Sequence, residues 1–183
     1  MRRFNRVRGV ILQTIIRCRR RCCGALPDKG LLSPFCQTSN VRYGSKADIQ
    51  RYPSLQRQRC DLFIPDGSEQ WFIEVKMMRL MGDNGKKNDN ILMHILSPYP
   101  KDRSALTDCD KLLESGFGGH KAVLIYGYDY AGWPLETAMA AFEILAESRT
   151  QLGPRSFAAF SGLVHPVHQC GGVYAWEVLG PAA

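Results

Sequence analysis

The stretch that decides the fold is residues 60–79, with the sequence CDLFIPDGSEQWFIEVKMMR. Two apolar runs flank a polar turn at residues 66–69 that contains Asp-Gly, a pattern typical of a β-hairpin. A register centred on this turn places Asp61 opposite Glu74, and Lys76 shares their face because side chains alternate along a strand. Two carboxylates and an ammonium group are therefore expected together on apolar strands. Burying charge is costly unless it is paired or binds a metal, so this trio indicates a functional site.

The rest of the chain alternates helical and strand patterns. Ser104 is placed to cap a helix that ends in a glycine-rich segment, and a nearly continuous apolar run comes after it, as expected for a central strand. The expected helices span residues 91–96, 104–115 and 135–149, and the expected strands after the hairpin span 121–128, 156–164 and 172–179. The order β-β-α-β-α-β-β predicts an α/β fold with a mixed sheet.

The hairpin and the elements after it resemble the PD-(D/E)XK nuclease superfamily, the restriction-endonuclease-like proteins. The resemblance rests on Asp61, a gap of twelve residues, then Glu74-Val75-Lys76, followed by a helix and an apolar strand, and it covers about residues 60–128. It implies a restriction-endonuclease-like core with a mixed central β-sheet flanked by helices, to which this chain adds a C-terminal helix and two strands. The family core is α-β-β-β-α-β, and the hairpin would supply its second and third strands.

The same resemblance implies a chemistry. A phosphodiester is anionic, so its hydrolysis calls for a divalent cation, Mg²⁺ or Mn²⁺, that neutralises charge and activates water. Asp61 and Glu74 would hold the metal with the backbone carbonyl of Val75, and Lys76 would stabilise charge that develops during the reaction. The expected function is therefore metal-dependent hydrolysis of nucleic acid, with DNA as the expected substrate. A homodimer is a further expectation, because cutting both strands of a duplex often needs two sites.

Other interpretations of the hairpin stay open. Asp66 completes a literal Pro-Asp, but it falls in the expected turn, where Asp commonly forms turns. A catalytically inactive protein that keeps the nuclease fold as a nucleic-acid-binding or interaction module would show the same pattern. A third possibility is an α/β protein whose hairpin presents Asp61, Glu74 and Lys76 to solvent, where a cross-strand ion pair contributes about 0.2–1 kcal/mol.

Two further groups of residues are candidates for binding. Basic residues that come after the motif strand could contact phosphates, namely Arg79, Lys86, Lys87, Lys101 and Arg103. His165 and His168 have the look of a metal cluster, but at the end of a strand they are expected to point to opposite faces.

The first part of the chain differs in composition from the rest. Residues 1–60 contain 14 Lys or Arg and two acids, whereas residues 61–183 contain 10 Lys or Arg and 15 acids. Residues 40–49, NVRYGSKADI, resemble a phrase that recurs at the ends of unrelated predicted bacterial reading frames. Residues 1–50 are therefore expected to be a basic, disordered or extraneous segment, and residues 51–183 a single nuclease-like domain. The alternative is a basic arm that binds nucleic acid.

Two observations bear on location. The sequence has no run of about 18 apolar residues, so we expect no transmembrane helix and no membrane partner. The seven cysteines are an odd number and no convincing export signal precedes them, which favours reduced thiols in the cytoplasm.

Overall fold

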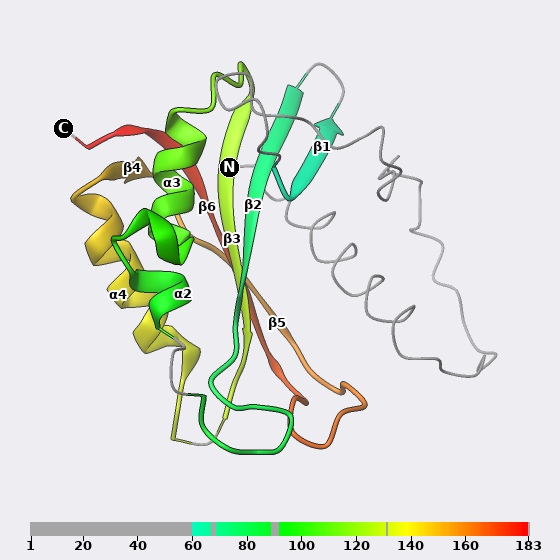
Figure 1. Ribbon diagram of the computed structural model, residues 1–183. Coiled ribbons are helices and arrows are strands. Elements are labelled where there is room, and N and C mark those ends of the chain that lie inside the picture. Colours follow the sequence, from blue (N-terminus) through cyan, green and yellow to red (C-terminus); the bar gives the residue numbers. More distant parts are fainter. Residues whose placement is uncertain (1–59, 67–68, 89–91, 131, 183) are drawn as a thin grey trace, which may run out of the picture. The chain divides into compact units, whose positions relative to one another are not determined.

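In the computed structural model, β1 (Leu62–Asp66) and β2 (Glu69–Met78) form the expected antiparallel hairpin (Figure 1). Pro65 pairs with Gln70, which is the predicted register. Asp66 is the last residue of β1 and pairs with Glu69 at the turn. The alternating apolar residues of the hairpin therefore set its register as the sequence indicates.

The structure describes residues 60–66, 69–88, 92–130 and 132–182. All of them belong to one unit of the chain, residues 46–183. The expected extraneous segment, residues 1–50, lies outside the described residues.

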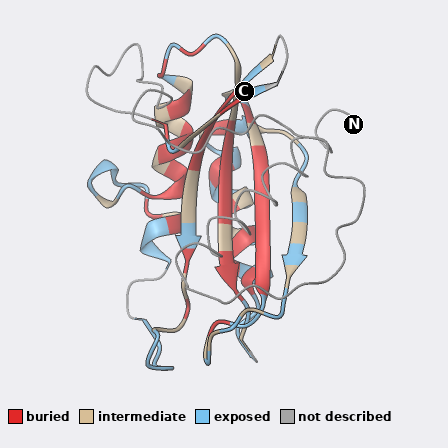
Figure 2. Ribbon diagram, turned by 90° about the vertical axis from the view of Figure 1, so that its right-hand side faces the viewer, coloured by how far each residue is buried: buried red, intermediate tan, exposed pale blue. Residues whose placement is uncertain are grey.

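A mixed sheet forms the centre of the described part of the chain. Strand β3 (His120–Tyr128) runs parallel to β2, and β6 (Gly171–Pro181) runs antiparallel to β3. Strands β4 (Thr150–Leu152) and β5 (Ser156–Phe160) both pair with β6, which gives the order β1-β2-β3-β6-β4 with β5 also on β6. Figure 2 shows buried residues concentrated in the central strands. The expected α/β class with a mixed sheet is confirmed.

The described helices cover one face of this sheet (Figure 1). They are α2 (Met93–Leu96), the 3₁₀ turn η1 (Pro100–Asp102), α3 (Ala105–Leu113) and α4 (Leu135–Glu147). Helix α3 contacts β2, β3 and β6, and α4 contacts β4 and β6. None of the helices in these described segments has the length and apolar character needed to cross a membrane. The core between helices and sheet includes Phe72, Leu106, Leu112, Ile125, Phe142 and Trp176.

The C-terminal part differs from the sequence-based expectation. The expected helix over residues 135–149 ends at Glu147, and the unexpected strand β4 comes after it. Thr150 pairs with Pro181 at the end of β6. Residues 150–152 therefore form a strand because they pair with a segment distant in sequence, which no local pattern indicates. The expected strand over residues 156–164 ends at Phe160.

Ser104 caps α3 as predicted, and its removal is a test of this local structure. Its hydroxyl accepts a hydrogen bond from the Thr107 backbone N–H at 3.2 Å and donates one to the Ser97 carbonyl. Ser104 is fully buried, so we expect Ser104→Ala to lower the free energy of unfolding by about 1–2 kcal/mol in urea titrations. The control is Ser148→Ala at the exposed end of α4, where we expect a change below about 0.5 kcal/mol. Equal losses in both variants would contradict the capping role.

Candidate functional site

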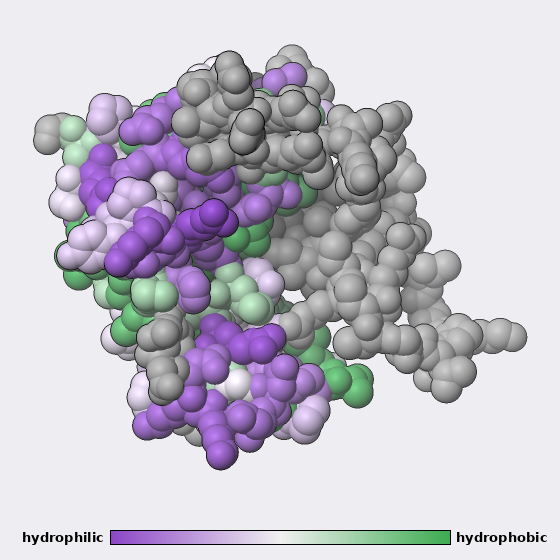
Figure 3. Space-filling view, in the orientation of Figure 1, coloured by the Kyte–Doolittle hydropathy of each residue, from purple (hydrophilic) through white to green (hydrophobic). Residues whose placement is uncertain are grey.

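A cleft of about 1060 Å³ lies beside α3, and the expected trio Asp61, Glu74 and Lys76 all line it. Strand β2 supplies Glu74 and Lys76 from its helix-facing side, between the core residues Phe72 and Met78. Hydrophilic residues gather on the surface over α3 (Figure 3), and this helix contributes a second set of charged side chains to the cleft. The α3 residues that line it are Thr107, Asp108, Asp110, Lys111 and Leu113.

Asp61 lies directly before β1, at the open end of the hairpin. It is exposed, and its Oδ2 atom accepts a hydrogen bond of 2.9 Å from the Val75 backbone N–H. This bond holds the Asp61 carboxylate against β2 at Val75, which lies between Glu74 and Lys76 in the strand. The role expected for the Val75 carbonyl stays a prediction.

Glu74 is buried, with 2% of its surface exposed. Its Oε1 atom lies 2.8 Å from Nζ of Lys111 on α3 and accepts a hydrogen bond from it. A buried carboxylate needs such a partner, because an unpaired charge is costly away from water. A hairpin that presents this acid to solvent is therefore not what the structure has.

Lys76 forms an ion pair with Asp108 of α3. Its Nζ atom lies 2.8 Å from Oδ2 of Asp108, which is 4% exposed. This ion pair compensates the charge of the buried carboxylate. Burial raises the pKa of Asp108 and the charge of Asp61 adds to the effect, while Lys76 and Lys111 act in the opposite direction. Asp108 is thus an acid that accepts a proton more readily than an ordinary aspartate.

Sequence reasoning missed Asp108 and Lys111. Ala105, Cys109 and Leu112 define the buried face of α3, and Asp108 falls within this face at helical spacing. An acid at a core-facing position was the available signal, because such positions are normally apolar. Lys111, three residues later, lies on the adjoining side of the helix and reaches the other acid of the cleft.

The Cys60 thiol next to this site is not a nucleophile. Burial raises its pKa to about 11, and the negative charges of Glu74 and Asp61 contribute in the same direction. The thiol is therefore protonated at neutral pH, and the thiolate is the reactive form.

Of the five basic residues expected to contact phosphates, only Arg103 lines the cleft. Arg79 instead forms an ion pair with Asp83 at 3.3 Å, and Lys87 lies 4.4 Å from the centre of the Trp133 ring. Lys101 lies 5.9 Å from the centre of the Tyr99 ring. Lys86 belongs to the loop after β2, whose hydrophilic surface appears in Figure 3 away from α3. Four of the five residues therefore lie outside the cleft, and their expected contacts with phosphates stay a prediction.

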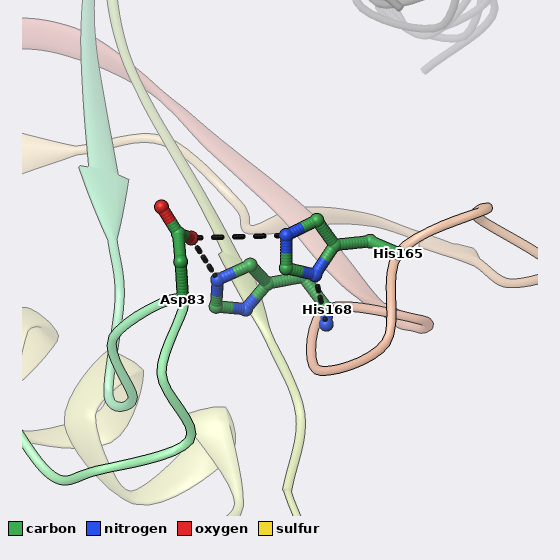
Figure 4. A group of neighbouring side chains, drawn as sticks. All are labelled: Asp83, His165 and His168. Carbon is green, nitrogen blue, oxygen red and sulfur yellow. Dashed lines mark hydrogen bonds and ion pairs between the residues drawn. The ribbon is translucent and has the colours of Figure 1, made fainter.

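The expectation that His165 and His168 point to opposite faces is also wrong. Both lie between β5 and β6, because the strand expected over residues 156–164 ends at Phe160 and neither histidine follows it directly. Without strand alternation their rings stack, with centroids 4.5 Å apart, and both approach Asp83 (Figure 4). These three residues do not line the cleft beside α3.

Comparisons with known proteins assign no family to this geometry. The chain matches no protein-family model, no curated protein and no solved structure.

Proposed function

We propose that this chain is a metal-dependent phosphodiesterase that hydrolyses nucleic acid, with DNA as the expected substrate, through a PD-(D/E)XK-type site. The observation that carries the proposal is that Asp61, Glu74 and Lys76 line one cleft. The order of elements gives further support, because the hairpin leads through α3 to β3, which runs parallel to β2. This is the order expected of a restriction-endonuclease-like core.

The donor atoms of the cleft fit a hard divalent cation. Mg²⁺ is usually bound through one or two carboxylates and retains several waters. Asp61, Glu74 and Asp108 offer carboxylates, of which Glu74 is paired with Lys111 and Asp108 with Lys76. These three acids do not each place an oxygen atom within 4.8 Å of the other two. We propose Asp61 and Glu74 as the ligands of the cation.

Each side chain has a part in the proposed reaction. The bound cation would supply charge neutralisation and a more acidic water. Lys76 provides a fixed positive charge where negative charge develops on the phosphoryl oxygens, and Asp108 holds this ammonium group in place at 2.8 Å. Lys111 holds Glu74 in the same way from the next turn of α3.

One observation favours a second function, a catalytically inactive nuclease-fold module that binds nucleic acid. In the structure, Glu74 pairs with Lys111 and Lys76 pairs with Asp108, so these four charges already compensate each other. These two ion pairs can keep the four side chains in place without a bound metal. Cleavage and binding assays on the same samples separate the two functions.

The test is incubation of the purified chain with plasmid and single-stranded DNA in Mg²⁺, Mn²⁺ or EDTA. We expect cleavage with either metal, none in EDTA, and a loss of at least about 10³-fold in rate for Glu74→Gln, since a metal ligand would be removed. The matched control is Glu147→Gln, at the exposed end of α4 and outside the cleft, which should cleave like the parent chain.

The outcomes divide clearly. Cleavage that persists in Glu74→Gln contradicts the proposed site. Binding of DNA that is unaffected by EDTA, with no cleavage under any condition, supports the inactive module instead.

A further inference from the structure

The second cluster of functional side chains joins three segments that are distant in sequence. Asp83 lies in the loop after β2, Tyr130 comes just after β3, and His165 and His168 lie between β5 and β6. His168 is 2% exposed and touches both of the other segments: its Nε2 atom is 2.8 Å from Asp83 Oδ1, and its Nδ1 atom is hydrogen-bonded to the Tyr130 hydroxyl. Figure 4 shows the side chains of Asp83, His165 and His168 converging.

We propose that Asp83, His165 and His168 form a binding site for a divalent transition-metal ion such as Zn²⁺. One atom from each residue lies within 4.8 Å of the others. The Nε2 atoms of His168 and His165 are 2.8 Å and 3.9 Å from Asp83 Oδ1. A tetrahedral ion with bonds of about 2.1 Å holds its ligands roughly 3.4 Å apart, so small movements bring the three atoms into place.

The donor set selects the class of metal. Two imidazoles and one carboxylate suit zinc and its neighbours among the transition metals, whereas Mg²⁺ prefers oxygen ligands alone. Three protein ligands would leave a further coordination position for water. The site is therefore different in chemistry, as well as in place, from the proposed Mg²⁺ site beside α3.

His168 can accept a metal without losing its other partner. When the proton of a neutral His168 is on Nε2, it is donated to the Asp83 carboxylate and Nδ1 accepts from the Tyr130 hydroxyl. When a metal takes Nε2, the proton moves to Nδ1 and donates to the same hydroxyl oxygen, because a hydroxyl can serve in either role. Tyr130 thus orients the metal-binding form, as outer partners of ligating histidines commonly do.

His165 and Asp83 each make contacts that oppose the binding of a metal. His165 Nδ1 accepts from the backbone N–H groups of Val167 at 3.1 Å and His168 at 3.0 Å, which favours a proton on its Nε2 atom. Ligation by His165 must break these two bonds, so it is the weakest ligand of the three. The guanidinium of Arg79, 3.3 Å from Asp83 Oδ1, competes with the metal for the carboxylate.

The test is equilibrium dialysis of the full chain against Zn²⁺ after alkylation of its accessible thiols under native conditions, which removes exposed cysteines such as Cys170 as ligands and leaves the buried Cys60 and Cys109 unmodified. We expect one Zn²⁺ per chain, displaced by Co²⁺ but not by a large excess of Mg²⁺. His168→Ala and Asp83→Asn should each weaken binding by at least about 100-fold, and Tyr130→Phe by about 10–100-fold. Arg79→Gln should tighten it, because a competing positive charge is removed.

His94→Ala, an exposed histidine of α2, is the matched control and should leave binding unchanged. Asp83 is exposed, so Asp83→Asn keeps the test valid if the buried His168 proves necessary for folding. Equal Zn²⁺ affinity in the parent chain and Asp83→Asn, or displacement of Zn²⁺ by equimolar Mg²⁺, overturns the proposal. None of these readouts depends on DNA cleavage, so the result is independent of the proposed function.

Discussion

Lys76→Met is expected to lower the rate of DNA cleavage by about 10²–10³-fold while DNA binding changes little. The substitution removes the positive charge and keeps most of the side-chain volume. A fixed charge that stabilises developing negative charge contributes to the transition state more than to the bound substrate, so the loss appears in kcat and not in the dissociation constant. Single-turnover cleavage and fluorescence anisotropy measure the two quantities separately.

The fold should survive this substitution because of Asp108. Its buried carboxyl loses the ammonium group 2.8 Å away, but burial, which already raises its pKa, favours the neutral form and so reduces the cost of the lost partner. Lys121→Met on β3, outside the cleft, is the matched control and should leave cleavage unchanged. A cleavage rate for Lys76→Met within about twofold of the parent chain would remove Lys76 from the catalytic machinery.

The sequence predicted the parts of this site that depend on local pattern. The turn and the alternation of apolar residues determine the β1–β2 register, and this places Asp61 beside the strand that holds Glu74 and Lys76. The cap at Ser104 determines where α3 begins. Both features involve neighbours in the chain or a single tight turn, so residue type and spacing are sufficient to find them.

The features that the sequence did not predict depend on packing between distant segments. Helix α3 crosses β2 so that Lys111 and Asp108 meet Glu74 and Lys76, and the partners are separated by about thirty residues. The histidine cluster shows the same limit, because His168 meets Asp83 only through the path of the segment between β5 and β6. Residue spacing alone cannot indicate such meetings, although the acid on the buried face of α3 was a usable sign.

Lys111→Met is expected to have the largest effect on stability at the site, a loss on the order of 3 kcal/mol in the free energy of unfolding. The variant removes an ammonium group 2.8 Å from a carboxylate that is 2% exposed, and the loss of one partner of a buried ion pair is strongly destabilising. Glu74→Gln alone should cost less, about 1 kcal/mol, because the Lys111 side chain is 23% exposed and can be hydrated. Urea titrations give both values.

The double variant Glu74→Gln/Lys111→Met shows whether the cost comes from the charge. Because the glutamine is neutral, this chain should be more stable than Lys111→Met alone, and the double-mutant cycle should give a coupling of about 1–3 kcal/mol. If the two losses simply add, Lys111 acts through packing and not through its charge.

The same variants also test the proposed metal site. An ion held by Glu74 takes the place of the lost ammonium group, so Mg²⁺ should raise the thermal stability of Lys111→Met more than that of the parent chain, and it should not do so in the double variant. A rise of equal size in all three chains would place the binding of Mg²⁺ elsewhere than at Glu74.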